Sequence, residues 1–234
     1  AATDLAIKLF RSSPIPDKQV FSNLGLFLNS RDLSRILFMD HIYRQIVDIQ
    51  GVVFEFGTRW GHNMAIFSAL RGIYEPFNRH RKIVGFDTFS GFPQVTDEDG
   101  RDDLMKVGNL TVTPGYEKYL EQIMEYHEQS NPLRHIKKYE IRKGDAAREI
   151  LTYLNDNPET IVALAYFDLD TYAPTKACLE AIAPRLVKGS VLAFDELNDH
   201  EAPGETKALA GVFGLPNIRL QRFRYASRVS YFVV

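Results

Sequence analysis

The chain alternates short apolar runs with longer stretches in which apolar residues recur every three or four positions. Short β-branched or aromatic runs predict buried strands, and the longer spacing predicts helices with one buried face. Strands are predicted at 52–56, 82–87, 161–168 and 190–195, with a weaker one at 138–142. Helices are predicted at 30–49, 62–73, 115–129, 146–156 and 174–186. This alternation predicts an α/β, doubly wound fold with a mostly parallel sheet.

Two strand-like runs, 218–224 and 229–234, end the chain and are separated by a short polar turn. They predict an antiparallel hairpin joined to the parallel sheet. We expect a single domain over residues 1–234, with an N-terminal helical extension over 1–50. The polar, acidic segment 94–115 lacks a clear pattern and is predicted to be a flap.

Composition narrows the classes of partner. The 234 residues carry 28 Lys+Arg and 30 Asp+Glu, and no basic block, which argues against nucleic acid or an anionic membrane as a partner. The apolar run 161–167 is far shorter than the ~20 residues of a membrane span, and Asp4 and Lys8 interrupt any signal peptide. The single cysteine, Cys178, suits a reducing compartment. We therefore expect a soluble, cytoplasmic protein.

Ligands of open α/β sheets bind at the carboxyl ends of the strands, so the residues after each predicted strand are the candidates. The first strand ends with Glu55, and the turn Gly57-Thr58-Arg59-Trp60-Gly61 follows before a helix. Gly57 permits a tight turn and Gly61 a close approach of a ligand to the backbone. The spacing is not that of a dinucleotide loop or a phosphate loop. The segment predicts a different cofactor site, with an ordinary glycine turn as the alternative.

Two further strand ends carry aspartates. Asp87 ends the second strand, where a carboxylate can accept hydrogen bonds from both hydroxyls of a ribose, although aspartate is also common at the start of a turn. Gly144-Asp145-Ala146 follows the weaker strand. Asp145 there either lies against an adenine or caps the following helix.

Four carboxylates follow two other strands: Asp168 and Asp170 after one, Asp195 and Glu196 after the next. Neighbouring strands lie about 4.8 Å apart, so these groups should converge. Like charges so close repel one another unless a cation lies among them. An all-oxygen set favours magnesium or calcium over zinc. A metal site is predicted, with helix capping as the alternative.

These segments together resemble the macrocin O-methyltransferase family, metal-dependent antibiotic-sugar methyltransferases that use S-adenosylmethionine. The likeness extends from Leu33 to Leu215. The matching segments are the loop at 55–63, Gly85-Phe-Asp-Thr-Phe-Ser-Gly-Phe-Pro93, Gly144-Asp145, and the pair 168–175 and 189–196. The terminal hairpin is similar to the one that ends the seven-stranded sheet of this class. The chain departs from the family in having Asp195-Glu196 instead of two aspartates, and Ser190 instead of a second glycine.

The resemblance implies an enzyme that transfers a methyl group to a sugar hydroxyl of a glycosylated natural product, with Mg²⁺ or another hard divalent cation. It also implies a homo-oligomer. Asp168, Asp195 and Glu196 would hold the metal. Asp170 would be the general base, although Asp168 and Asp170 can exchange these roles. The expected cofactor-binding residues are Glu55, Gly57, Thr58, Gly61, Asp87, Asp145 and Ala146.

The sulfonium methyl is already activated, so the enzyme has to align an acceptor oxygen with it and remove a proton. A divalent cation would favour the alkoxide of a weakly acidic sugar hydroxyl. The acceptor stays open, since a phenol, a catechol or an amine would need similar machinery. The alternative bases are His41, His62, His127 and His200.

Two rival functions remain. A short-chain NAD(P)-dependent oxidoreductase would use Tyr172 and Lys176 from one helix, but Pro174 is expected in the first helical turn, which would leave Tyr172 outside. Asn63 also stands where the last glycine of its cofactor loop belongs. A non-catalytic binding module would be expected to lose part of the carboxylate cluster, which this chain keeps.

Overall fold

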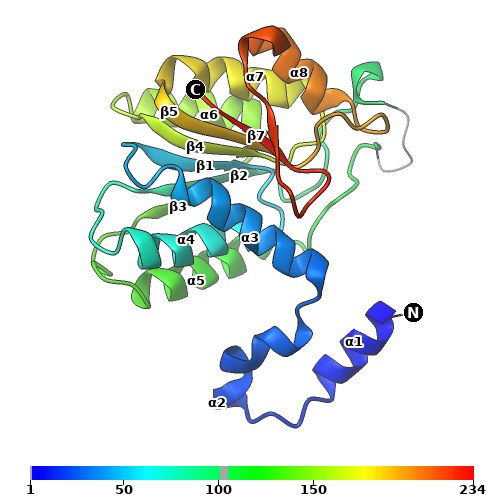
Figure 1. Ribbon diagram of the computed structural model, residues 1–234, viewed down its shortest axis with the longest axis vertical. Helices are drawn as coiled ribbons and strands as arrows, with labels where there is room; N and C mark the ends of the chain where they lie inside the picture. The colour runs from blue at the N-terminus through cyan, green and yellow to red at the C-terminus, as the bar shows by residue number, and fades with distance from the viewer. Residues whose placement is uncertain (1, 101–104) are drawn as a thin grey trace.

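The computed structural model describes residues 2–100 and 105–234, and these contain a seven-stranded sheet in the order β3-β2-β1-β4-β5-β7-β6 (Figure 1). Strands β1 to β5 are parallel, whereas β7 is antiparallel to both β5 and β6. The strands are β1 (Val52–Phe56), β2 (Ile83–Asp87), β3 (Tyr139–Lys143), β4 (Val162–Phe167), β5 (Leu186–Phe194), β6 (Gln221–Arg222) and β7 (Ser230–Val233). The predicted doubly wound sheet with a C-terminal antiparallel hairpin is confirmed.

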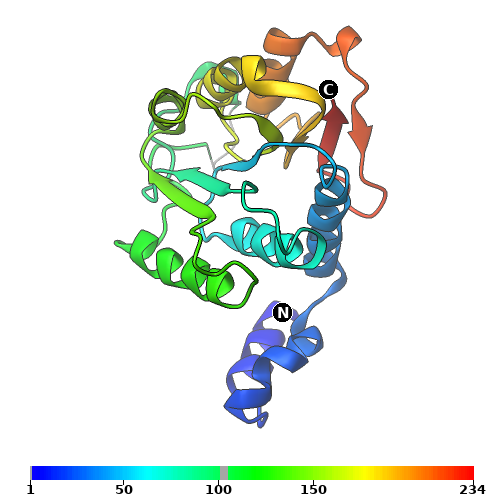
Figure 2. The same cartoon turned by 90° about the vertical axis from the view of Figure 1, so that its left-hand side faces the viewer.

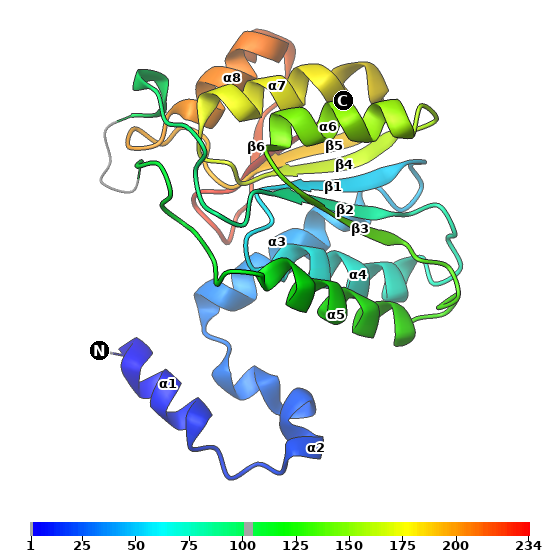
Figure 3. The same ribbon diagram turned by 180° about the vertical axis from the view of Figure 1, so that it is seen from behind.

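Helices cover both faces of the sheet (Figures 1 and 3). One face carries α3 (Ser30–Arg44), α4 (His62–Tyr74) and α5 (Tyr116–Gln129). The other carries α6 (Ala146–Asp156), α7 (Tyr172–Ile182) and α8 (Gly204–Phe213). Each face has its own apolar core. All six residues of β4 are buried, because this central strand is covered on both sides.

A row of phenylalanines crosses the sheet at the carboxyl ends of four strands: Phe56, Phe167 and Phe194 end their strands, and Phe86 is the second-last residue of β2. Phe56 of β1 is paired in register with Phe86 of β2 and Phe167 of β4, and Phe167 with Phe194 of β5. The neighbouring rings stack with centroids 4.9, 4.9 and 5.0 Å apart. Because a slip by one residue would turn every ring to the opposite face, this row fixes the level at which the four strands end.

The helix predicted at 30–49 ends early, at Arg44, and turns follow it. The side chain of Arg81 donates hydrogen bonds to the carbonyl oxygens of Ile46, Ile49 and Gly51. These carbonyl oxygens point at the guanidinium and so do not accept the hydrogen bonds that a continuing helix would require. The prediction missed this end because the apolar spacing of Ile46 and Val47 fits a turn packed on the core as well as a helix.

Three further elements differ from the prediction. Helix α7 begins at Tyr172, so the expectation that Tyr172 lies outside it was wrong. Pro174 occupies the first turn, where a missing N–H removes no helical hydrogen bond, so two residues can precede it. Strand β5 begins at Leu186, four residues before the predicted start at 190, and α8 was not predicted.

Residues before Ser30 form α1 (Ala2–Arg11), α2 (Asp17–Val20) and the 3-10 helix η1 (Phe21–Phe27), which project from the sheet and its helices (Figure 2). None of their described residues is buried. We call residues 2–29 the N-terminal arm.

The predicted flap, 94–115, includes residues 101–104, which lie outside the described part of the chain. Its described residues include the 3-10 helix η2 (Asp97–Asp99), where buried Asp99 accepts a hydrogen bond from the backbone N–H of Tyr172. Among the described helices, none combines the length and apolar character that a bilayer span requires.

Candidate active site

The carboxyl ends of β1 to β5 surround two adjoining hollows. The first has a volume of about 690 Å³, including the part open to solvent. Four of the predicted cofactor-binding residues line it: Gly57, Asp87, Asp145 and Ala146. They come from three separate strand ends, so the fold brings together what the sequence spreads over some 90 positions. Arg59, Asp168 and Asp170 lie in the same wall.

Asp87 is held rigidly at the edge of this hollow. Its Oδ2 accepts a hydrogen bond of 2.7 Å from the backbone N–H of Arg59, and its Oδ1 one of 2.6 Å from that of Phe89. Burial raises the pKa of Asp87, while these two N–H groups oppose the rise. Each oxygen keeps a second lone pair, so the carboxylate can still accept hydrogen bonds from a ligand.

Asp145 caps a helix, which is one of the two alternatives that the sequence left open; its contact with an adenine stays a prediction. It is the N-cap of α6, and its Oδ1 accepts a hydrogen bond of 3.0 Å from the backbone N–H of Ala147. It also lines the first hollow together with Gly144 and Ala146. A capping aspartate held in this way presents its backbone and second oxygen to a ligand.

Glu55 and Thr58 form a buried polar pair of a different kind. Both carboxylate oxygens of Glu55 and the Oγ1 of Thr58 are buried and have no hydrogen-bond partner of good geometry among the described residues. Burial raises the pKa of Glu55 to about 8, although Asn63 and Arg35 lie near enough to oppose the rise. Thr58 lines the second hollow, described below, whereas Glu55 lines neither hollow. Buried polar atoms without a partner require an explanation, and a bound ligand is one that fits.

Gly61 lies outside both hollows. Its φ is +76°, and a Cβ there would lie 2.2 Å from Cδ1 of Leu120 on α5. The glycine is therefore required by the packing of α5 and by the left-handed backbone at the start of α4.

The second hollow measures about 1520 Å³, including the part open to solvent. Asp168 and Asp170 line both hollows, so they lie at the junction between them. Four arginines surround the second hollow: Arg31, Arg35, Arg59 and Arg228.

Two of these arginines hold the predicted metal-binding carboxylates. Arg35 forms ion pairs of 3.0 Å with Asp168 Oδ2 and with Asp195 Oδ1. Arg228 forms an ion pair with Glu196 Oε1. Asp168 and Asp195 thus converge as predicted, whereas Glu196 turns toward the C-terminal hairpin. Within residues 2–100 and 105–234, no three His, Cys, Asp or Glu side chains are grouped as metal ligands.

Asp170 is placed by a buried glutamate on α8. Oε1 of Glu205 accepts hydrogen bonds from the backbone N–H groups of Leu169 (2.9 Å) and Asp170 (3.3 Å). This holds Asp170 at a left-handed φ of 59°. Burial and the neighbouring Asp195 raise the pKa of Asp170 to about 6, close to the range that suits a general base.

The sequence did not reveal Arg35, Arg228, Tyr166 or Glu205 as parts of this site. Tyr166, for example, donates a hydrogen bond of 2.6 Å to Asp195 Oδ1. The one available signal was the predicted cluster of four carboxylates, which requires counter-charges from somewhere in the chain.

Comparison of the chain with models of protein families and with curated protein sequences finds no match. Solved structures do match it. The calicheamicin methyltransferase CalS11 has a TM-score of 0.97 and 44% identity, over 99% of this chain and 90% of that one. An apo structure of CalS11, named as a TDP-rhamnose 3'-O-methyltransferase of calicheamicin biosynthesis, has a TM-score of 0.88 and 41% identity, over 99% and 92%. The chain belongs to this family of sugar O-methyltransferases.

The O-methyltransferase NovP, with a TM-score of 0.60 and 16% identity over 86% of this chain and 79% of that one, shares the fold. The likeness to CalS11, and not the fold shared with NovP, identifies the protein as an S-adenosylmethionine-dependent O-methyltransferase. Membership in this family, and not the geometry of Tyr172, excludes the dehydrogenase reading, since Tyr172 and Lys176 do share α7.

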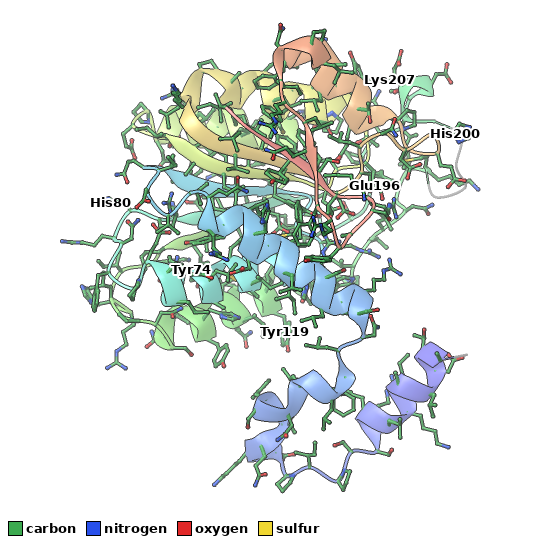
Figure 4. All side chains as sticks on the ribbon, in the orientation of Figure 1. Tyr74, His80, Tyr119, Glu196, His200 and Lys207 are labelled. Carbon is green, nitrogen blue, oxygen red and sulfur yellow. The ribbon has the colours of Figure 1, made fainter. Side chains whose placement is uncertain are left out.

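Among the histidines proposed as bases for this methyltransferase, His62 lines the second hollow. His41 instead forms a hydrogen bond of 2.8 Å with the hydroxyl of Tyr231, and His127 lies on α5. His200 is exposed on the same side of the molecule as Glu196, with His80 on the opposite side (Figure 4). The geometry leaves Asp168, Asp170 and His62 as candidate bases.

Proposed function

We propose that the protein methylates a sugar hydroxyl in natural-product biosynthesis, on a glycosylated natural product or its nucleotide-sugar precursor. The observation that carries this proposal is 44% identity to CalS11 over 99% of the chain, with two hollows that meet at carboxylates. Methyl transfer requires the donor and the acceptor to lie side by side.

The first hollow suits S-adenosylmethionine. Asp87 would accept hydrogen bonds from the ribose hydroxyls through its remaining lone pairs, and Asp145 and Ala146 would lie near the adenine. Glu55 and Thr58, buried and unpaired, would receive the ammonium group of the methionine moiety. Gly57 would let the cofactor approach the backbone at the end of β1, while Gly61 would act indirectly by positioning the loop.

The acceptor would occupy the second hollow, with its hydroxyl beside Asp170. Asp170 would remove the hydroxyl proton as the sulfonium methyl is transferred, and Glu205 would hold it in place for this step. The side chains of Arg31 and Arg59 make no ion pair or hydrogen bond within the described residues, which supports an acceptor that carries phosphates.

The carboxylates at the junction suit a divalent cation by their chemistry. Asp168 and Asp195 would hold it, because a cation, the Arg35 guanidinium, already lies between them. Glu196 also lines the second hollow and would join them by leaving its ion pair with Arg228. When bound, the ion would stabilise the acceptor as an alkoxide. The single cysteine supports a reducing, cytoplasmic location.

The N-terminal arm supports a homo-oligomer. Its helices bury no described residue, yet Leu5, Leu9, Phe10, Phe21 and Leu26 lie exposed on it. Apolar surface of this kind is typical of a subunit contact.

The proposal is tested by incubating the protein with methyl-labelled S-adenosylmethionine and TDP-rhamnose. We expect label in the sugar, loss of transfer with EDTA, and recovery with Mg²⁺. Transfer that persists in EDTA would remove the metal from the proposal, and absence of transfer to any of a panel of nucleotide sugars and glycosides would contradict the sugar acceptor.

A further inference from the structure

Arg35 lies at the centre of the carboxylate cluster and binds four acceptors at once. Its Nη1 donates to Asp195 Oδ1, and its Nη2 donates to Asp168 Oδ2, both at 3.0 Å. Its Nε reaches Asn63 Oδ1 at 3.2 Å, and Nη2 also reaches the hydroxyl of Tyr166 at 3.3 Å. One side chain from α3 therefore joins the ends of β4 and β5 to the start of α4.

The guanidinium occupies the position that a metal ion would need. Two carboxylates that face one another in a largely buried site repel unless a cation separates them. Arg35 binds one oxygen of each, and a divalent cation bridging Asp168 and Asp195 would have to use oxygens of the same two groups. The two cations cannot lie between the carboxylates together, because they would repel each other at contact distance.

We propose that Arg35 is an internal counter-ion that competes with the divalent cation for Asp168 and Asp195, so that the metal binds when the guanidinium withdraws. This inference rests on the proposed use of a metal. It assigns Arg35 a positioning role: its single charge offsets part of the repulsion between Asp168 and Asp195, and it sets how tightly the cluster binds a metal.

The position of Arg35 on α3 allows this withdrawal. The buried residues of α3 are Phe38, Met39, Ile42 and Tyr43, all of which follow Arg35. Its own side chain is 34% exposed and lines the second hollow. The guanidinium can therefore turn into the hollow by changing its rotamer while the anchored half of the helix stays in the core.

The test measures metal binding directly, by electron paramagnetic resonance of Mn²⁺ titrated into the full-length protein. We expect Arg35→Gln to bind Mn²⁺ at least about tenfold more tightly than the wild type, because the competing charge-assisted hydrogen bonds are gone. Arg35→Lys, which keeps the charge but cannot form the same fork, should bind with intermediate affinity. Cooperative thermal unfolding checks that each variant is folded.

Arg31→Gln is the matched control. It removes the same charge from the same helix and the same hollow, but Arg31 forms no ion pair with a carboxylate in the described residues. We expect its Mn²⁺ affinity to stay within about twofold of the wild type, since exposed charges are screened.

Equal gains in the Arg31 and Arg35 variants would overturn the inference, as would an unchanged or weaker affinity in Arg35→Gln and Arg35→Lys. Absence of Mn²⁺ binding by every variant would also overturn it. Labelled methyl transfer is measured separately, so failure of the sugar O-methylation proposal is distinguishable from failure of this one.

Discussion

Glu55 is a buried carboxyl group that we propose lies beside the ammonium group of the cofactor. It is 1% exposed, and burial raises its pKa to about 8 in the cofactor-free protein. A carboxyl group with a raised pKa in the folded state makes folding less favourable as pH rises from its unfolded pKa toward 8. A cationic ligand group beside it would favour the ionised form and so reverse this penalty.

We predict that S-adenosylhomocysteine binding depends on pH through Glu55. The ammonium group of the ligand requires the ionised carboxylate, so affinity should be full above pH 8 and fall by up to about tenfold per unit below it. Calorimetry between pH 6.5 and 9 in buffers of different ionisation heats would show proton release at pH 7.

Glu55→Gln is the control for this pH dependence. The amide does not titrate, so its cofactor affinity should be lower at pH 9 and nearly constant over the same range. If the wild type binds S-adenosylhomocysteine with the same affinity at every pH, or if Glu55→Gln shows the same pH dependence as the wild type, the ammonium group binds to a residue other than Glu55.

At the scale of elements, the decisive contact is between the turn after β1 and the end of β4. Gly57 has a φ of +90°, and a Cβ there would lie 1.9 Å from the backbone carbonyl oxygen of Asp168. The turn after β1 and the residue that follows β4 therefore approach each other backbone to backbone. Only glycine permits this approach, and the row of stacked phenylalanines holds both strands at the required level.

We predict that Gly57→Ala lowers the free energy of unfolding by about 1–3 kcal/mol or more and weakens binding of S-adenosylhomocysteine, because backbone has to move on both sides of the hollow. Chemical denaturation and calorimetry would measure the two effects.

Gly115→Ala provides a matched comparison. Gly115 also has a positive φ, +77°, but a Cβ there meets nothing within 4 Å. The free energy of unfolding of Gly115→Ala should fall by only about 1 kcal/mol, the cost of the positive φ, and its cofactor affinity should not change. Equal losses in the two variants would mean that the contact with Asp168 has no role.

At the scale of the whole molecule, the N-terminal arm is the feature that the sheet and its helices do not account for. Phe10 and Phe27 stack edge to face at 5.0 Å, but the arm has no buried residue in its described part. Isolated helices of this length are marginal in water, so we expect the arm to pack on a surface outside this chain.

We predict that the full-length protein is an oligomer held by this arm. The double variant Phe21→Glu, Leu26→Glu replaces side chains that are 75% and 71% exposed, and it should lower the mass measured by light scattering after size exclusion. The two introduced glutamates would lose their hydration in the subunit contact, and this cost would weaken the oligomer.

Phe77→Glu serves as the control for this prediction. Phe77 is 74% exposed but lies after α4, away from the arm, so its replacement should leave the mass unchanged. A monomeric wild type, or an oligomer that survives the double variant, would assign the arm a different partner.

The sequence by itself determined the sheet, most of the element boundaries and the row of strand-end residues. Strand β1 and helix α6 have the predicted bounds, because strong apolar periodicity and a capping aspartate are local signals. Gly57, Asp87, Asp145 and Asp168 share a hollow for a topological reason. The carboxyl ends of parallel strands lie along one edge, so no side-chain detail was needed to bring them together.

Only the tertiary structure decided what the carboxylates contact. Arg35 is 133 residues from Asp168 and 160 from Asp195 in the chain, and Glu205 is 35 residues from Asp170. Helix α3 likewise ends just before Ile46, whose carbonyl oxygen accepts a hydrogen bond from a distant arginine, Arg81. Counter-charges can come from any element that packs nearby, and sequence spacing carries no information about such packing. The sequence therefore located the carboxylates at the strand ends, and the packing of α3, α8 and the C-terminal hairpin decided which groups contact them.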